Sequence, residues 1–232
     1  FVTDIYTATT HHYLLFFTNK GKVYKLRAWD IPEAGRHAKG TAIVNLLELD
    51  PDEKVSAVIP ITGEEKDMYL FMATRAGMVK KTPLEQYDNI RKGGLLAVTL
   101  KENDELIEVR LTDGNDEVIL VTKNGMAIRF PESDVRAMGR TSQGVIGIRL
   151  DEGDEVISML RCYENATLLV VTENGFGKRT DIEEYKVQSR GGKGILTYKV
   201  TEKTGALVGA KVVDEQDDIL LVNTDGNIIR IP

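Results

Sequence analysis

The sequence holds one cysteine, Cys162, in 232 residues. A single cysteine excludes an intrachain disulfide and any site built from several thiolate ligands, and it suits a reducing compartment. No apolar run reaches 18 residues and no basic-then-apolar leader opens the chain, so the sequence predicts no membrane span and no signal peptide. We therefore expect a cytoplasmic protein with no membrane contact.

Histidine is almost as scarce, with three residues in the chain. Two of them, His11 and His12, are adjacent, and adjacent side chains on a strand point to opposite faces. Acidic clusters are present but lack EF-hand spacing. No Ser/His/Asp or Cys/His set stands out. We predict no metal site, no catalytic residue and no cofactor.

Helical periodicity is missing as well. No stripe with a 3.6-residue period has useful length, and the segment 131–139 is expected to hold at most one helical turn. The 21 glycines are spread along the whole chain, which indicates many turns rather than one flexible linker. The fold class is predicted to be all-β.

An internal repeat is the most informative feature that is present. Five segments each combine a short apolar run, a Thr or Asn, a polar pair and a glycine. These segments are 13–21, 69–77, 118–125, 168–175 and 219–226. Asn-Gly and similar pairs between apolar runs indicate tight hairpins, so a second strand is expected after each glycine.

A second glycine follows about twenty residues later, and each copy is preceded by basic residues. We call these stretches the corner segments: 36–40, 91–94, 140–144 and 190–194. A third strand is expected after each corner segment, at 41–47, 95–100, 145–150 and 195–200. A fourth strand is expected at 54–60, 105–111, 155–161 and 206–212.

Four short strands in about fifty residues are typical of a propeller blade. The sequence predicts one β-propeller-like domain over 1–232 with no internal linker. Its repeats are expected at about 10–61, 67–112, 116–162 and 166–213, with a partial repeat at 217–232. Trp29 and Tyr87, in corresponding connections, are expected to pack in the core or between blades.

Charge is distributed unevenly within each repeat. We counted charges in the windows that run from each hairpin turn to the second glycine, together with the end of the last repeat. These windows are 18–40, 74–94, 122–144, 172–194 and 224–232. They hold 21 of the 30 Lys and Arg but only 11 of the 36 Asp and Glu. The mean charge of -6 therefore hides a segregation of cations from acidic turns. If the repeats stack as blades, the cations form a row along one rim and the acidic turns lie elsewhere. Such a row suits a polyanion.

The cations recur at two positions in the repeat. One lies four residues after the turn glycine, and the other lies in the corner segment, where glycines let a phosphate approach the backbone N–H groups. This repertoire suits DNA backbone contact and bending rather than base readout. The predicted DNA-binding residues are Lys25, Arg36, Lys39, Lys80, Lys81, Arg91, Lys92, Arg129, Arg140, Lys178, Arg179, Arg190, Gly191, Gly192, Lys193 and Gly194.

Several long stretches resemble the C-terminal domain of DNA gyrase A and its relative in topoisomerase IV. The resemblance covers essentially the whole chain. It is carried by FFTNKGKVYKL (16–26), IPEAGRHAKG (31–40), RFPESDVRAMGRTSQGV (129–145), VTENGFGKRT (171–180) and QSRGGKG (188–194). QSRGGKG keeps six of the seven residues of the family's box Gln-Arg-Arg-Gly-Gly-Lys-Gly, with Ser189 in place of an arginine.

The resemblance implies an open or spiral β-pinwheel whose blades exchange strands and whose basic rim wraps duplex DNA with positive handedness. In the family this wrap presents the transported segment for ATP-dependent negative supercoiling, while catalysis lies in other parts of the complex. The implied partners are double-stranded DNA without sequence preference, the rest of gyrase A, and gyrase B. The isolated domain is expected to be monomeric. Because the box copy lies in the fourth repeat, we expect the first blade upstream of Phe1.

Other interpretations remain open. The chain could be the topoisomerase IV domain, a propeller scaffold for a protein partner, or a chromatin-type propeller that docks on protein-bound DNA. The segment 191–194 is not read as a P-loop, because the Ser or Thr after the lysine and the following helix are both missing.

Overall fold

A computed structural model describes residues 5–232. In this part of the chain all regular structure is β-strand or short 3-10 turn, and there is no α-helix. No helix in it is long and apolar enough to cross a membrane. The prediction of an all-β fold is confirmed.

The strands form four successive antiparallel blades and a final hairpin. Blade 1 has the order β3-β1-β2-β6, with β1 (Tyr13–Thr18), β2 (Lys22–Arg27), β3 (Val55–Ile61) and β6 (Leu95–Leu96). Blade 2 has the order β10-β5-β4-β7, with β4 (Tyr69–Thr74), β5 (Met78–Pro83), β7 (Leu106–Thr112) and β10 (Val145–Ile146). Blade 3 has the order β11-β8-β9-β14, with β8 (Glu117–Thr122), β9 (Met126–Pro131), β11 (Val156–Cys162) and β14 (Ile195–Leu196).

Blade 4 has three strands in the order β13-β12-β15, and a separate hairpin follows it. The blade consists of β12 (Thr167–Thr172), β13 (Gly177–Asp181) and β15 (Leu207–Val213). The hairpin pairs β16 (Ile219–Val222) with β17 (Ile228–Ile231). All five predicted hairpins are therefore present.

A Thr-x-x-Gly turn recurs in the hairpins of the four blades, and Asn223 replaces the threonine in the last hairpin. In blade 2 the N–H of Gly77 donates to the carbonyl of Thr74 (3.0 Å), and the N–H of Met78 donates to the Thr74 hydroxyl (3.2 Å). Gly77 has φ +90°, a conformation that favours glycine. The buried threonine thus closes the turn from both sides.

Strand exchange between blades places the corner segments. The two-residue strands β6, β10 and β14 each pair with the outer strand of the preceding blade. The next two N–H groups, of Ala97 and Val98 in the first case, both donate to the carbonyl of the turn glycine Gly21 (2.7 and 3.2 Å). The second, third and fourth repeats therefore each complete the blade before them, as the resemblance implies.

The prediction of the third strands is wrong in two respects. These strands are shorter than predicted, and in the first repeat there is no strand. Only two residues pair where six were expected, because the chain then leaves the outer strand to bond to the turn glycine. In the first repeat the segment 41–47 has no strand and holds a 3-10 turn, η2 (Ile43–Asn45).

A 3-10 turn follows the second strand in each of the four blades. These turns are η1 (Ala28–Asp30), η3 (Leu84–Tyr87), η4 (Glu132–Asp134) and η5 (Ile182–Glu184). The single helical turn expected within 131–139 is confirmed by η4. Tyr87 is buried as predicted, whereas Trp29 is 50% exposed, so its predicted packing in the core is wrong.

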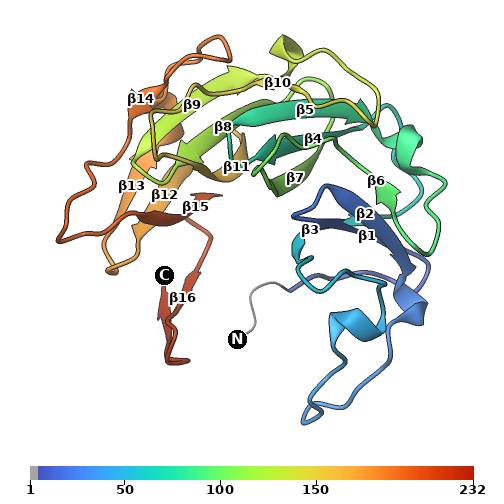
Figure 1. The fold of residues 1–232 in the computed structure, drawn as a ribbon. Helices are drawn as coiled ribbons and strands as arrows, with labels where there is room; N and C mark the ends of the chain where they lie inside the picture. The colour runs from blue at the N-terminus through green and yellow to red at the C-terminus, as the bar shows by residue number, and fades with distance from the viewer. Residues whose placement is uncertain (1–4) are drawn as a thin grey trace.

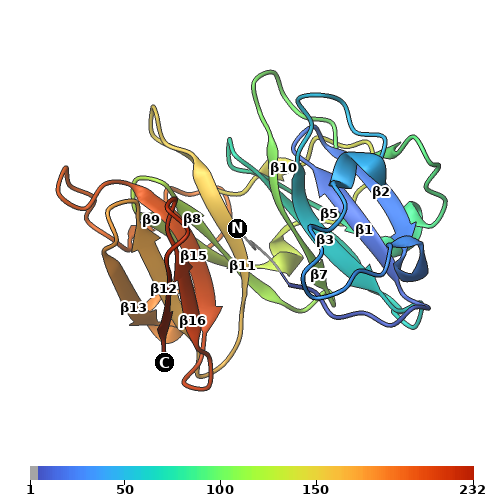
Figure 2. The same ribbon diagram turned by 90° about the horizontal axis from the view of Figure 1, so that it is seen from below.

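The apolar core lies mainly between successive blades. Separate clusters of buried residues join blade 1 to blade 2, blade 2 to blade 3 and blade 3 to blade 4, and a fourth lies in blade 1. The blades form an open arc, with β3, β7, β11 and β15 on its inner side and β6, β10 and β14 on its outer side (Figure 1). The two ends of the arc lie apart in both views (Figure 1 and Figure 2).

Candidate nucleic-acid interface

Three corner segments, 91–94, 140–144 and 190–194, lie where one repeat crosses to the blade before it, whereas no crossing strand follows 36–40. Two backbones meet closely there, which explains the second glycine. A Cβ added to Gly194 would lie 2.3 Å from the carbonyl oxygen of Ala127, and the residue has φ +76°. The equivalent Gly144 would approach the carbonyl of Val79 to the same 2.3 Å. These glycines are therefore required by the fold.

The arginine of a corner segment is held by the corner before it. The guanidinium of Arg190 donates to the carbonyls of Ile146 (3.0 Å) and Asp134 (3.1 Å). Arg140 donates in the same way to the carbonyl of Leu96. Both residues are only partly buried, so each guanidinium is fixed in place while still facing solvent.

The remaining corner cations are exposed: Arg36, Lys39, Arg91, Lys92 and Lys193. Two of them face carboxylates of the preceding repeat. Lys193 Nζ lies 3.3 Å from Asp151 Oδ1, and Lys92 Nζ lies 3.8 Å from Glu48 Oε1. The expectation that acidic residues lie away from the cation row is therefore wrong for these two positions.

Residues 188–194 (QSRGGKG), which we call the box segment, use part of their backbone for hydrogen bonds within the fold. The N–H of Gly191 donates to the carbonyl of Gly147 (2.7 Å), and the carbonyl of Gly192 accepts from the N–H of Arg149 (2.8 Å). The N–H of Gly191 is thus not free for a phosphate. Within the described chain no hydrogen bond from the N–H groups of Gly192 and Lys193 is present.

A second set of predicted contacts has a structural role instead. We call Lys25, Lys81 and Arg129, which lie four residues after the turn glycines, the joint cations. Each donates to main-chain carbonyls at the 3-10 turn of the next blade: Lys25 to Asp88 (3.4 Å), Lys81 to Glu132 (3.2 Å), and Arg129 to Ile182 (3.0 Å) and Tyr185 (3.2 Å). The prediction that this position forms an exposed rim is wrong, because the next blade covers it.

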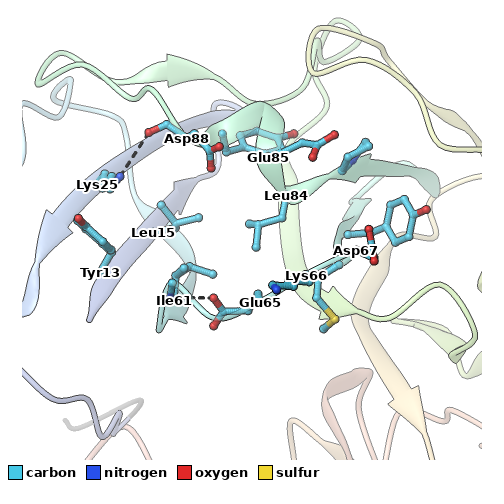
Figure 3. A pocket seen from close by; sticks show the side chains of 15 residues that line it. Tyr13, Leu15, Lys25, Ile61, Glu65, Lys66, Asp67, Leu84, Glu85 and Asp88 are labelled. Atoms are coloured by element: carbon cyan, nitrogen blue, oxygen red, sulfur yellow. Dashed lines mark hydrogen bonds between the residues drawn. The ribbon is translucent and has the colours of Figure 1, made fainter. Parts of the chain in front are cut away.

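Lys25 shows how a joint cation lies between blades (Figure 3). Its ammonium lies 4.1 Å from the centre of the Tyr13 ring, at the edge of a cleft of about 530 Å³ between blades 1 and 2. The cleft is at the strand ends remote from the turn glycines, and Leu15 and Leu84 line it. The ammonium of Lys25 is therefore held between the two blades, by the Tyr13 ring of blade 1 and the Asp88 carbonyl of blade 2.

Arg129 is the most strongly held joint cation. Its side chain is 10% exposed and forms an ion pair of 2.7 Å with Glu117 on the neighbouring strand β8. A second carboxylate, of Glu183, lies 3.9 Å away. With two carbonyls and two carboxylates around it, this guanidinium has no face left for DNA.

Lys80 is also buried, with 1% of its surface exposed. Its ammonium donates to the carbonyls of Ala97 (2.5 Å) and Arg140. Burial lowers the pKa of Lys80 to about 7, and the nearby guanidinium of Arg140 adds to the effect. The prediction that Lys80 and its buried neighbour Lys81 contact DNA is corrected: both lie inside the molecule.

The equivalent residues of blade 4 differ. Lys178 donates to the carbonyl of Thr197 (3.0 Å), as Lys80 does to Ala97, yet Lys178 and Arg179 are exposed. The described chain has no crossing strand on β13, so no strand covers them. These two remain candidate contacts.

Additional cations lie beside the corner segments and were not predicted. Arg149 and Lys199 each follow a corner glycine by five residues, and Arg136 and Lys186 each follow a turn glycine by eleven; all four are exposed. The hydrogen bond of the Arg149 N–H to Gly192 places Arg149 next to the box segment. Their fixed spacing was the signal that could have found them.

One group of carboxylates, Asp113, Asp116 and Glu132, brings its oxygens within 4.8 Å of one another. Glu132 is fully buried and accepts hydrogen bonds from the Thr112 hydroxyl (2.7 Å) and the N–H groups of Gly114 (2.7 Å) and Asp116 (2.8 Å). Its carboxylate closes the connection between blades 2 and 3.

Blades that exchange strands around an open arc, with a cation-bearing corner at each crossing, define the β-pinwheel class of propeller-like domains. The family model described as "DNA gyrase C-terminal domain, beta-propeller" matches residues 12–62, 69–113, 116–162 and 166–214. The chain belongs to this family. Each matched segment holds three strands of one blade, and the crossing strands β6, β10 and β14 fall in the segment that follows.

Curated relatives and solved structures agree with this assignment. The chain is 62% identical to DNA gyrase A of Halalkalibacterium halodurans and 54% identical to that of Clostridium acetobutylicum, each over 100% of the chain and 28% of the relative. It thus spans about a quarter of their length. A solved DNA gyrase A C-terminal domain matches with a TM-score of 0.82 and 31% identity, over 96% of this chain and 73% of that one. The C-terminal domain of DNA topoisomerase IV matches with a TM-score of 0.87 and 33% identity, over 96% and 70%.

Proposed function

We propose that the chain binds duplex DNA without sequence preference and bends it along the outer side of the arc. The observation that carries this proposal is the repetition of the corner segment at three successive blade crossings, each with at least one exposed or half-exposed cation. Two corner arginines are fixed by carbonyls of the corner before them, which lowers the entropy lost on binding a phosphate. A curved row of such cations fits the regularly spaced phosphates of a duplex.

The set of proposed contacts is smaller than the set predicted from the sequence, although it gains Arg149. They are Arg36, Lys39, Arg91, Lys92, Arg140, Lys178, Arg179, Arg190, Gly192, Lys193 and Arg149. The contact is electrostatic and is made to the backbone, so it needs no cofactor, and the chain acts as a monomer.

In the full enzyme we propose that this domain wraps DNA and presents the transported segment, while ATP-dependent supercoiling chemistry occurs in the rest of gyrase A and in gyrase B. The domain itself is then a non-catalytic part of a type IIA topoisomerase in the bacterial cytoplasm. The names of the curated relatives favour gyrase over the topoisomerase IV alternative.

The test measures affinity for a duplex on the 200-bp scale by fluorescence anisotropy across a range of salt. The logarithm of the affinity should fall linearly with the logarithm of the salt concentration, by about 0.9 for each phosphate neutralised. Arg91→Glu combined with Lys193→Glu should make this slope shallower by about 2 and weaken binding at least tenfold. Lys66→Glu, which changes an exposed cation on the remote cleft, should leave both unchanged.

Wrapping is tested separately by sealing a nicked circular duplex in the presence of the chain. A positive change in linking number supports wrapping with the proposed hand. Salt-insensitive binding, or a double variant that binds DNA as tightly as the parent, would count against the proposal and favour a protein-binding scaffold.

A further inference from the structure

An exposed apolar side chain recurs at the corners, beside the cations. It is the second residue of each crossing strand: Leu96 in β6, Ile146 in β10 and Leu196 in β14, exposed by 40%, 41% and 60%. The first residue of each strand packs inward against the core between blades. Successive residues of a strand face opposite sides, so the second residue is held outward.

A single exposed leucine on a soluble protein needs no explanation. Here all three crossing strands of the described chain present a branched apolar residue at the same position, two residues after the corner glycine. The corner segment that precedes each of them carries both a cation and a glycine. This is an apolar row within a polar, basic surface.

Hydrogen bonds tie this row to the arginines. The carbonyl of Leu96 accepts from Arg140, and that of Ile146 accepts from Arg190 (3.0 Å). Each of these two apolar residues therefore lies next to the guanidinium of the following corner. The strands that carry the apolar row, β6, β10 and β14, follow one another along the outer side of the arc (Figure 1).

A bent DNA duplex presents both kinds of group that this surface would contact. Its phosphates bind cations, and the deoxyribose rings that line its minor groove offer apolar surface. Proteins that bend DNA often place aliphatic side chains in that groove. We propose that Leu96, Ile146 and Leu196 contact the deoxyribose walls of the minor groove between phosphates held by the corner cations, and so fix where the duplex bends.

This inference rests on the proposed DNA binding, and salt separates the two. An apolar contact releases no counterions, so its loss lowers affinity without changing the salt slope, whereas loss of a phosphate contact changes the slope. The test variant is Leu96→Ala/Ile146→Ala/Leu196→Ala. The matched control is Val208→Ala/Ile228→Ala/Ile229→Ala, three exposed aliphatic residues on β15 and β17, away from the corners.

The test variant should bind a duplex on the 200-bp scale about tenfold more weakly than the parent, with a parallel salt plot, and should bend it less by end-to-end energy transfer. The control should bind within twofold of the parent. Thermal melting checks that both variants are folded. Unchanged affinity in the test variant, or a loss accompanied by a shallower slope, would overturn the inference. Absence of salt-dependent binding by the parent would instead overturn the proposed function.

Discussion

Two rows of cations recur in every repeat, and they behave differently. The joint cations Lys25, Lys81 and Arg129 reach across to the next blade and donate to its 3-10 turn. The cations of the corner segments 91–94, 140–144 and 190–194 precede the crossing strands on the outer side of the arc and are exposed or half-exposed. In the sequence the two rows have the same periodicity. Periodic charge alone therefore does not distinguish cations that hold two blades together from cations that bind a ligand.

The last blade shows what causes the difference. Arg179 occupies the same position as Arg129, yet it is exposed. The part of the next repeat in the described chain is the β16–β17 hairpin, which has no 3-10 turn to accept from this position. Whether a joint cation is buried therefore depends on whether the next blade packs against it. The following variants test this comparison.

The largest effect is expected at Arg129. Arg129→Met leaves two carbonyls and the Glu117 carboxylate without their partner, so the free energy of unfolding should fall by about 3 kcal/mol. Urea denaturation measures this change. Arg179→Met at the equivalent exposed position should change stability by less than about 0.5 kcal/mol. Equal losses in the two variants would contradict the division into joint and surface cations.

A smaller loss is expected at the corner glycine that the crossing requires. Gly194→Ala places a Cβ 2.3 Å from the Ala127 carbonyl oxygen at φ +76° and should cost about 2 kcal/mol of unfolding free energy. Gly192→Ala is the control, since the nearest atom to its Cβ would be 3.8 Å away. If Gly192→Ala is equally unstable, the assignment of Gly194 to the fold and Gly192 to the surface fails.

The pH dependence of stability should reveal the buried Lys80. Its pKa is about 7 in the folded protein against an ordinary 10.5, so the unfolded chain binds more protons between these values. The parent should therefore gain stability as pH rises from 7 to 10.5, by at least about 1 kcal/mol relative to Lys80→Met. Denaturation curves at several pH values measure this difference. Lys178→Met, at the exposed counterpart, is the control. The stability of this variant should change with pH as the stability of the parent does.

The smallest effect is expected at the carboxylate that faces the box lysine. Asp151→Asn removes the partner 3.3 Å from Lys193, and because both side chains are exposed the gain in DNA affinity should be two- to fivefold, about 1 kcal/mol or less. Anisotropy titrations at low salt resolve this change. Glu64→Gln, an equal change of charge in the exposed connection between blades 1 and 2, should leave DNA affinity as it is. A gain of the same size in Glu64→Gln would mean that only net charge matters.

Local features of the fold were predictable from the sequence. The hairpins of the four blades follow from apolar runs joined by a Thr-x-x-Gly turn. In blades 2 to 4 the threonine hydroxyl and carbonyl both accept hydrogen bonds that close this turn, as at Thr74. The 3-10 turn within 131–139 was also found from local signals. Such signals depend on residues four or fewer apart.

Features that depend on strand exchange were not predictable from local pattern. The run 95–100 has the composition of a strand, but only Leu95 and Leu96 pair, because the chain then bonds to Gly21 in another repeat. The exposure of Lys81 depends in the same way on a 3-10 turn fifty residues later. Such contacts leave no periodic signal that separates them from a surface row.

Strand exchange also has a consequence for local opening. Each crossing strand belongs to one repeat by sequence and to the preceding blade by pairing, so a blade opens only when its neighbour releases it. A duplex that spans two corners would bridge the crossing between them. Amide hydrogens at the crossings, such as those of Ala97 and Val98 bonded to Gly21, should then exchange more slowly with solvent deuterium when DNA is bound, although they contact no DNA themselves.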